Sequence, residues 1–285
     1  MSNSAKELLS KAVFDDFYVG SKGVGLIRSE RLFLERGIDH GFSTRIGGIS
    51  EPPFDTLNLG TSRNEPMSNI LTNYRILCSA YGLDYDDLAL VRHEHGSNIL
   101  RLTGEDRGRG LDREPLEYSD GLVTNDPSVT LVTCHADCSA FFFYDKKHGA
   151  IGLAHAGWKG MYARIGQKMV LRMHDEFGTD PSDLSAVIGP CICEKCFEVD
   201  LNLGEAFEKE FDCPDILAAG TGKKSDKAYV SLRAAALIQL LDAGMSESSI
   251  SIMDHCTMEE KDLFYSYRRD GKDTGSMAAY LKLNR

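Results

Sequence analysis

Residues 128–160 read SVTLVTCHADCSAFFFYDKKHGAIGLAHAGWKG, and this stretch decides the fold. Three runs rich in β-branched and aromatic residues, at 128–134, 140–144 and 150–154, are typical of buried strands. The segment DKKHG at 145–149 lies between two of these runs and is typical of a hairpin turn. We therefore expect at least part of the sheet to be antiparallel.

Helices are expected on both sides of this block of strands. Residues 65–81 have a helical apolar stripe followed by Gly82, residues 161–177 have a second stripe, and residues 231–243 a third. The first stripe consists of Ile70, Tyr74, Leu77 and Cys78. Helices before and after the strands, without regular alternation, indicate an α+β fold with mixed, partly antiparallel sheets packed with helices.

Composition indicates a globular protein. The 285 residues are 42% hydrophobic and 26% charged, and no repeat or linker divides them, so we expect a single domain over residues 1–285. The net charge of -11 argues against binding to nucleic acid, which depends on clustered lysine and arginine. We expect no secretory leader, no membrane association and a cytoplasmic location, because the N-terminus is charged throughout and no stretch reaches transmembrane length.

Three short segments place metal-binding residue types beside the ends of expected strands. His95, Cys138 and His155 lie in HEHG, ADC and HAGW, respectively. Zinc accepts imidazole nitrogen and thiolate sulfur, and three protein ligands leave a fourth position open for water or substrate. These residues therefore predict a catalytic zinc site. The alternative is a set of ordinary core histidines and a buried cysteine, because the separations match no finger motif.

The residues beside these segments have two interpretations each. Asp137 either orients a ligating histidine or caps a turn. Trp158, the single tryptophan, either packs in the core or walls the pocket. Gly96 and Gly157 either allow close approach of the backbone to the site or belong to ordinary turns at the strand ends.

In its motifs, the chain resembles the YfiH-type laccase-domain family of purine nucleoside phosphorylases along nearly its whole length. The motifs, in order, are HGFSTRIGGIS (40–50), NLG (58–60), HG (95–96), SDGLVT (119–124), ADC (136–138), AHAGWKG (154–160), IGPCIC (188–193), CT (256–257) and FYSYRRDGKDTG (264–275). The resemblance implies a YfiH-like layered domain, with zinc held by His95, Cys138 and His155. It also implies phosphorolysis of adenosine, inosine and related nucleosides to free base and ribose 1-phosphate, with adenosine deaminase and methylthioadenosine phosphorylase activities.

Two of the departures from the pattern of that family bear on the site. His93 stands where glutamine is common, and it is an alternative ligand or a donor in the pocket. Ser276 stands where arginine is frequent, so this protein lacks any contribution of that arginine to substrate affinity.

The expected substrates are a purine nucleoside and phosphate, bound by a monomer or a small homo-oligomer. Arginine suits phosphate because its planar fork donates paired hydrogen bonds. Arg45 and Arg268, both in matching motifs, are the candidate phosphate-binding residues. The alternative for each is an ion pair at the surface of an acidic protein, which is also the simplest role for Arg269.

A second group of cysteines lies at 191–196, in the sequence CICEKC. Cys191, Cys193 and Cys196, with Cys256 as a fourth ligand, suit a soft metal. We favour reduced structural thiols here, because Cys191 and Cys193 point the same way only in an extended strand and the resembling family has no known cluster at this stretch. About one zinc ion per chain is therefore expected.

Other functions remain as alternatives. A copper-dependent polyphenol oxidase, or laccase, needs histidines in paired motifs, and His93 with His95 is the single such pair. A cysteine hydrolase would use Cys138 as nucleophile and His155 as base. A zinc-binding module without catalysis would bind the metal and turn nothing over.

Overall fold

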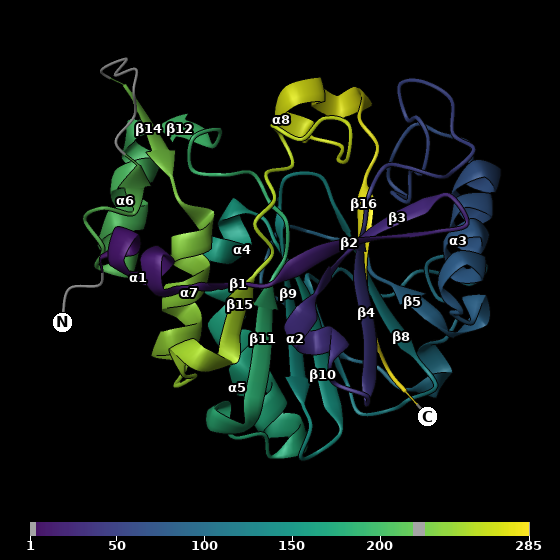
Figure 1. The fold of residues 1–285 in the computed structure, drawn as a ribbon, viewed down its shortest axis with the longest axis horizontal. Helices are drawn as coiled ribbons and strands as arrows, with labels where there is room; N and C mark the ends of the chain where they lie inside the picture. Colours follow the sequence, from purple (N-terminus) through teal and green to yellow (C-terminus); the bar gives the residue numbers. More distant parts are fainter. Residues whose placement is uncertain (1–3, 219–225, 285) are drawn as a thin grey trace.

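The computed structural model describes residues 4–218 and 226–284, and their elements form four layers (Figure 1). A seven-stranded and a six-stranded sheet pack face to face in the middle. Several helices cover the outer face of the seven-stranded sheet, and one long helix covers that of the six-stranded sheet. The predicted α+β class, with mixed sheets packed against helices, is therefore confirmed.

The seven-stranded sheet has the order β1-β15-β11-β9-β10-β7-β6. Its strands are β1 (Val13–Phe14), β15 (Ile250–Ile252), β11 (Leu184–Ile188), β9 (Ser139–Asp145), β10 (Ala150–Ala156), β7 (Gly121–Thr124) and β6 (Ile99–Arg101). The predicted hairpin is present, since β9 and β10 pair antiparallel with Ala150 opposite Asp145. The Asp145 carboxylate fixes the turn by accepting the backbone N–H groups of Lys147 and His148 at 2.9 and 3.0 Å.

The six-stranded sheet has the order β2-β3-β4-β16-β8-β5. Its strands are β2 (Asp16–Ser21), β3 (Val24–Ser29), β4 (Ile38–Ser43), β16 (Met277–Leu283), β8 (Thr130–His135) and β5 (Leu88–Leu90). A small third sheet, in the order β12-β14-β13, consists of β12 (Glu198–Asp200), β14 (Lys227–Val230) and β13 (Leu217–Ala218). The chain passes from the six-stranded to the seven-stranded sheet twice, between β5 and β6 and between β8 and β9.

Both faces of β9 are buried, which explains its continuous apolar sequence. Phe142 points between the two sheets, where it belongs to the same core cluster as Phe42 and Leu131. Phe141 and Phe143 point the other way, into the core beneath the helices. Alternation along the strand thus divides neighbouring phenylalanines between two layers of the core.

Helices α1 (Ala5–Lys11), α5 (Ile165–Phe177), α6 (Leu201–Phe211) and α7 (Leu232–Asp242) lie on the side of the seven-stranded sheet, and α3 (Met67–Tyr81) covers the six-stranded sheet (Figure 1). The short helices are α2 (Glu30–Phe33), α4 (Trp158–Tyr162) and α8 (Tyr267–Asp270), and the 3₁₀ turns are Tyr85–Asp87, Gly104–Asp106, Pro181–Asp183, Glu247–Ser249 and Gly271–Asp273. The predicted stripe of α3 is buried throughout.

The single helix expected over 161–177 is two helices, which corrects that prediction. Arg164 adopts a left-handed conformation, with φ at 58°, and separates α4 from α5. Its guanidinium donates to the carboxylates of Glu210 and Asp242 at 2.7 and 2.8 Å. These distant partners hold a backbone conformation that is uncommon for a residue with a side chain.

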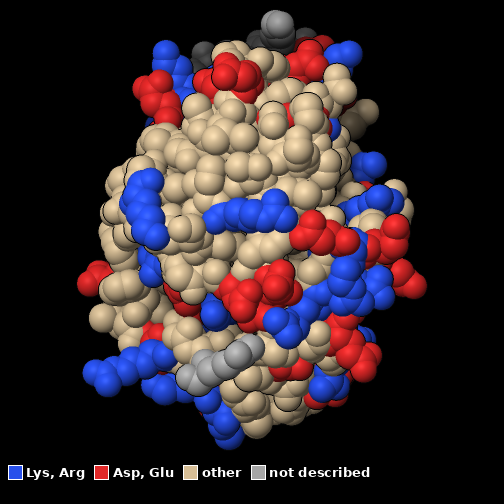
Figure 2. Space-filling model, turned by 90° about the vertical axis from the view of Figure 1, so that its right-hand side faces the viewer, with Lys and Arg blue, Asp and Glu red and all other residues tan. Residues whose placement is uncertain are grey.

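The outer surface carries both signs of charge. Figure 2 shows the side of the molecule on which α3 lies, where acidic and basic side chains are interspersed with uncharged ones rather than joined into a basic surface. In the described part of the chain, every helix is too short or too polar to cross a membrane.

Candidate functional site

A cavity of about 900 Å³ lies beside the strand ends where the chain crosses between the two large sheets. His95, Cys138 and His155 all line it. His95 comes from the connection between β5 and β6, Cys138 from the connection between β8 and β9, and His155 from the C-terminal end of β10. The ligand atoms of these three residues lie within 4.8 Å of one another. The fold therefore brings together the three residues that the resemblance implied as zinc ligands.

Gly157 explains how the three candidate ligand residues approach so closely. A Cβ atom at this position would lie 2.9 Å from Cδ2 of His95 and 3.2 Å from Sγ of Cys138. Any larger residue would therefore displace the ligands. The interpretation of this glycine as a site of close approach is the one that the structure supports.

Asp120 positions two of the three candidate ligand residues. Its buried carboxylate lies 2.8 Å from Nδ1 of His155 and accepts the backbone N–H groups of residues 94–96 at 2.7 to 3.3 Å. When the ring is neutral, the contact with Asp120 favours the proton on Nδ1 and makes Nε2 available as a metal ligand. The same carboxylate also fixes the turn that carries His95, whose φ of 60° is left-handed.

Asp137, the residue expected either to orient a ligating histidine or to cap a turn, has a different role in the structure. Its carboxylate accepts hydrogen bonds from the hydroxyls of Thr257 and Ser266 at 2.7 and 3.0 Å and from the backbone N–H of Arg268 at 2.6 Å. Asp137 thus ties the Cys138 segment to the segment that carries Arg268. The SDG motif at 119–121 was the available signal for Asp120, although no role had been attached to it.

The charges of Cys138 and His155 support each other. Burial opposes ionisation of the thiol, but His155 and His95 outweigh it and lower the pKa of Cys138 to about 7. Burial also opposes the imidazolium, but the Cys138 thiolate and the Asp120 carboxylate outweigh it and raise the pKa of His155 to about 9. A thiolate is therefore accessible near neutral pH, and the thiolate is the form that binds a metal.

His93 lies in the same cavity, but both of its ring nitrogens are engaged. Nε2 accepts the backbone N–H of Cys134 at 3.0 Å, and Nδ1 faces the carbonyl oxygen of Ser119 at 3.3 Å. The ring stacks on His155 with centroids 4.2 Å apart, and burial and His155 hold the pKa of His93 well below its usual range. His93 is therefore a neutral packing and hydrogen-bonding partner, and the set with free ligand atoms is that of His95, Cys138 and His155.

Two candidate phosphate-binding arginines occupy different places. Arg268 lines the cavity, with its guanidinium over the ring of Phe197 and Nη1 donating to the carbonyl oxygen of Glu198 at 2.8 Å. Arg45 is not brought to the cavity. It donates to the carbonyl oxygen and carboxylate of Asp55 and packs over the ring of Tyr265. Its fork is therefore used in holding two loops together.

Arg63 and Arg92 also line the cavity and were missed from the sequence. Nε of Arg63 donates to the hydroxyl of Ser276 at 3.2 Å, so an arginine lies against the position where the resembling family often has one. Trp158 lines the cavity as well, with 39% of its surface exposed, which fits its interpretation as a pocket wall. Arg269 does form the expected ion pair, with the carboxylate of Asp270 at 2.7 Å, and it also donates to the carbonyl oxygens of Thr257, Met258 and Phe264.

Known proteins share the sequence motifs and the fold of this chain along nearly its whole length. The family described as multi-copper polyphenol oxidoreductase laccase matches residues 39–284. Purine nucleoside phosphorylase YlmD of Bacillus subtilis is 35% identical over 244 residues, which cover 85% of this chain and 87% of that protein. The crystal structure of YlmD from Geobacillus stearothermophilus has a TM-score of 0.85 at 29% identity and covers 96% of this chain and 100% of that chain.

A second solved structure agrees. The hypothetical protein YfiH of Bacillus licheniformis has a TM-score of 0.84 at 30% identity, and the match covers 94% of this chain and 99% of that chain. The match to the family over most of the sequence, and the shared fold along nearly the whole chain, show that this chain belongs to the YfiH-type laccase-domain family.

Proposed function

We propose that this chain is a zinc-dependent purine nucleoside phosphorylase that cleaves adenosine, inosine and related nucleosides with phosphate, and that deaminates adenosine in a side reaction. One observation carries the proposal: an open set of two imidazoles and a thiol shares a cavity with three arginines. The cavity volume of about 900 Å³ is within the range typical of small-molecule sites. The names of the relatives support the same activity.

The residues present suit zinc. Two histidine nitrogens and a thiolate are ligands that zinc prefers, and a three-residue set leaves a coordination position for water or substrate. When bound, zinc supplies a Lewis acid that polarises an oxygen atom and lowers the pKa of a bound water. The chain's own contribution is to hold Nε2 of His155 free through Asp120 and to keep the space beside Gly157 clear.

Phosphate and purine would be recognised by different parts of the cavity. Arg268 and Arg63 are each anchored through part of the guanidinium, so their remaining N–H groups are held in place for an anion. Tyr118, Trp158 and Phe197 give the cavity aromatic surface on which a purine ring can stack.

Replacing Arg268 or Arg63 by alanine should raise the KM for phosphate by roughly 10–100-fold, because a hydrogen bond to a charged group contributes about 1.5–3 kcal/mol. Lysine should restore affinity only in part, since it lacks the planar fork. Initial rates of inosine cleavage at saturating nucleoside and varied phosphate measure the effect. Arg45→Ala is the matched control, with a lowered melting temperature and an unchanged KM for phosphate. An unchanged KM in both cavity variants would place the anion elsewhere.

Asp120→Asn should lower zinc affinity by roughly 10–100-fold, as is typical for the partner of a ligating histidine. An amide has a single acceptor oxygen, and its NH₂ group would face the donors that the carboxylate now accepts. Competition with a chelator of known affinity measures the change. Asp145→Asn is the matched control, because this buried carboxylate also contacts a histidine, His148, but lies at the hairpin. Equal zinc affinity in both variants would show that Asp120 does not support zinc binding.

The copper oxidase alternative rests on the description of the family. Four histidine rings do gather here, those of His93, His95, His135 and His155. However, His135 is engaged by the carbonyl oxygen of Cys138 and the hydroxyl of Thr133 at 3.1 and 2.8 Å. The described residues also bring the ligand atoms of His93, Asp120 and His155 within 4.8 Å of one another, but this group shares His155 with the first. Because the two groups cannot both bind through His155, the cavity offers a mononuclear site rather than the several copper sites of multicopper oxidation.

A further inference from the structure

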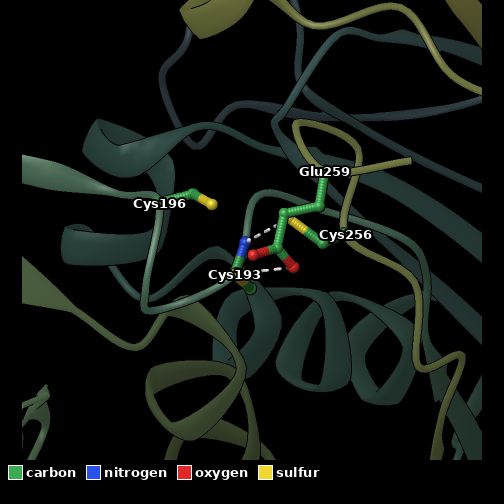
Figure 3. A group of neighbouring side chains, drawn as sticks. All are labelled: Cys193, Cys196, Cys256 and Glu259. Atoms are coloured by element: carbon green, nitrogen blue, oxygen red, sulfur yellow. Dashed lines mark hydrogen bonds between the residues drawn. The ribbon is translucent and has the colours of Figure 1, made fainter. Parts of the chain in front are cut away.

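A second group of soft ligands lies behind the wall of the cavity. We propose that Cys193, Cys196, Cys256 and Glu259 bind a structural zinc ion, separate from the ion proposed at His95, Cys138 and His155. Figure 3 shows the four side chains converging from two segments of the chain. Cys193 and Cys196 follow β11, and Cys256 and Glu259 follow β15.

The distances suit a tetrahedral site. One ligand atom from each of the four residues lies within 4.8 Å of all the others, and Sγ of Cys193 lies 3.9 Å from Oε2 of Glu259. In a tetrahedral site with Zn–S bonds of ~2.3 Å, the sulfur atoms are roughly 3.8 Å apart. The side chains therefore need only small movements to enclose an ion. Four protein ligands also leave no open position, which is typical of a structural site.

The backbone prearranges this geometry. Cys191 forms a parallel bridge with Cys256, because its N–H donates to the carbonyl oxygen of His255 at 3.3 Å and its own carbonyl oxygen accepts from Thr257 at 3.2 Å. This pairing brings Cys193 beside Cys256, whose Sγ accepts the backbone N–H of Cys193 at 3.4 Å. An N–H donor of this kind also stabilises a thiolate when it binds a metal.

The Cys193–Cys196 segment has the C-x₂-C spacing of zinc-binding turns. Its turn is closed by the N–H groups of Cys196 and Phe197, which donate to the carbonyl oxygen of Cys193 at 3.0 and 2.9 Å. Both cysteines thus come from one tight turn. Cys256 faces this turn, as the soft-metal alternative from the sequence expected, whereas Glu259 takes the place that this alternative gave to Cys191.

Glu259 is the fourth member of the group. Its neighbour Glu260 is engaged by the backbone N–H of Cys256 and by the ring of His255, at 2.8 and 2.7 Å. Among the described contacts, the Glu259 carboxylate has one hydrogen-bond partner, the thiol of Cys193. A carboxylate that is directed at three thiols supplies both the charge and the oxygen that complete a zinc site.

The site would brace the wall of the cavity. Arg268 donates to the carbonyl oxygens of Cys196 and Glu198 at 3.4 and 2.8 Å, and Phe197 lines the cavity between them. An ion that joins the Cys193–Cys196 turn to the 256–259 segment would fix the backbone against which Arg268 is held.

Metal counting on protein purified under reducing conditions tests the proposal. Wild-type protein and the control Cys78→Ala, a buried thiol in α3, should hold two zinc ions per chain. Cys138→Ala should hold one, and Cys193→Ser and Cys196→Ser should also hold one. Glu259→Gln should lose one of its two ions to a chelator faster than the wild type. A wild-type protein with one zinc ion, all of it retained in Cys196→Ser, would overturn the proposal.

A second measurement needs only the wild-type chain, so it does not depend on the folding of variants. In zinc-loaded protein, Cys193, Cys196 and Cys256 should resist alkylation, and chelation should expose them together. Alkylation of all three in the zinc-loaded protein, or a disulfide between Cys193 and Cys196, would contradict the proposal. Neither readout depends on nucleoside turnover, so failure of the proposed activity and failure of this site are distinguishable.

Discussion

Cys138→Ala should abolish zinc binding at the open site and reduce both inosine phosphorolysis and adenosine deamination by more than ~100-fold, since loss of an outer partner alone typically costs 10–100-fold. Cys138 supplies the single thiolate among the three proposed ligands. Loss of both reactions together is expected because both would depend on one metal.

Zinc content and both rates, measured on the same preparation, check this prediction. Cys78→Ala is the control, because it removes a buried thiol from α3, outside the cavity. It should keep full zinc and rates close to those of the wild type. If Cys138→Ala keeps the zinc and both activities, the three-residue site is not the catalytic centre.

The layers of the fold follow from local sequence patterns. The hairpin at 145–149 was predictable because apolar runs flank a charged turn, and its antiparallel pairing is confirmed. The break at Arg164 was not predictable, because neither glycine nor proline marks it and its partners Glu210 and Asp242 are distant in sequence. The passage of the chain from one large sheet to the other could not be predicted from the local apolar pattern either, because it depends on pairing between strands that are distant in sequence.

In the candidate site, too, some residues could be identified from local motifs and others only from long-range contacts. The proposed ligands were identified through motifs, whereas Asp120 and Arg63 were not assigned because their roles depend on contacts between segments far apart in the chain. Arg45 has a motif as clear as that of Arg268, yet Asp55 and the ring of Tyr265 hold its side chain. A motif identifies a candidate residue, but tertiary packing decides whether the side chain of that residue reaches the cavity.

Omission of phosphate should reduce cleavage of inosine to less than about 1% of its rate at saturating phosphate, while adenosine is still converted to inosine. The reason is that the two reactions use different nucleophiles. Phosphorolysis needs the anion that Arg268 and Arg63 are proposed to hold, whereas deamination uses water. Arg268→Ala should therefore slow phosphorolysis more than deamination, and replacement of His155 should slow both. Equal effects of phosphate on the two reactions would show that they are not separable in this way.

The most direct test supplies inosine with phosphate labelled by ¹⁸O at every oxygen and determines the mass of the sugar product. Attack of phosphate on C1′ predicts hypoxanthine and a ribose 1-phosphate that retains all of the labelled oxygens, formed only when phosphate is present. Free ribose formed without phosphate would contradict the account. So would phenol oxidation with oxygen uptake that depends on added copper and is accompanied by no turnover of nucleoside.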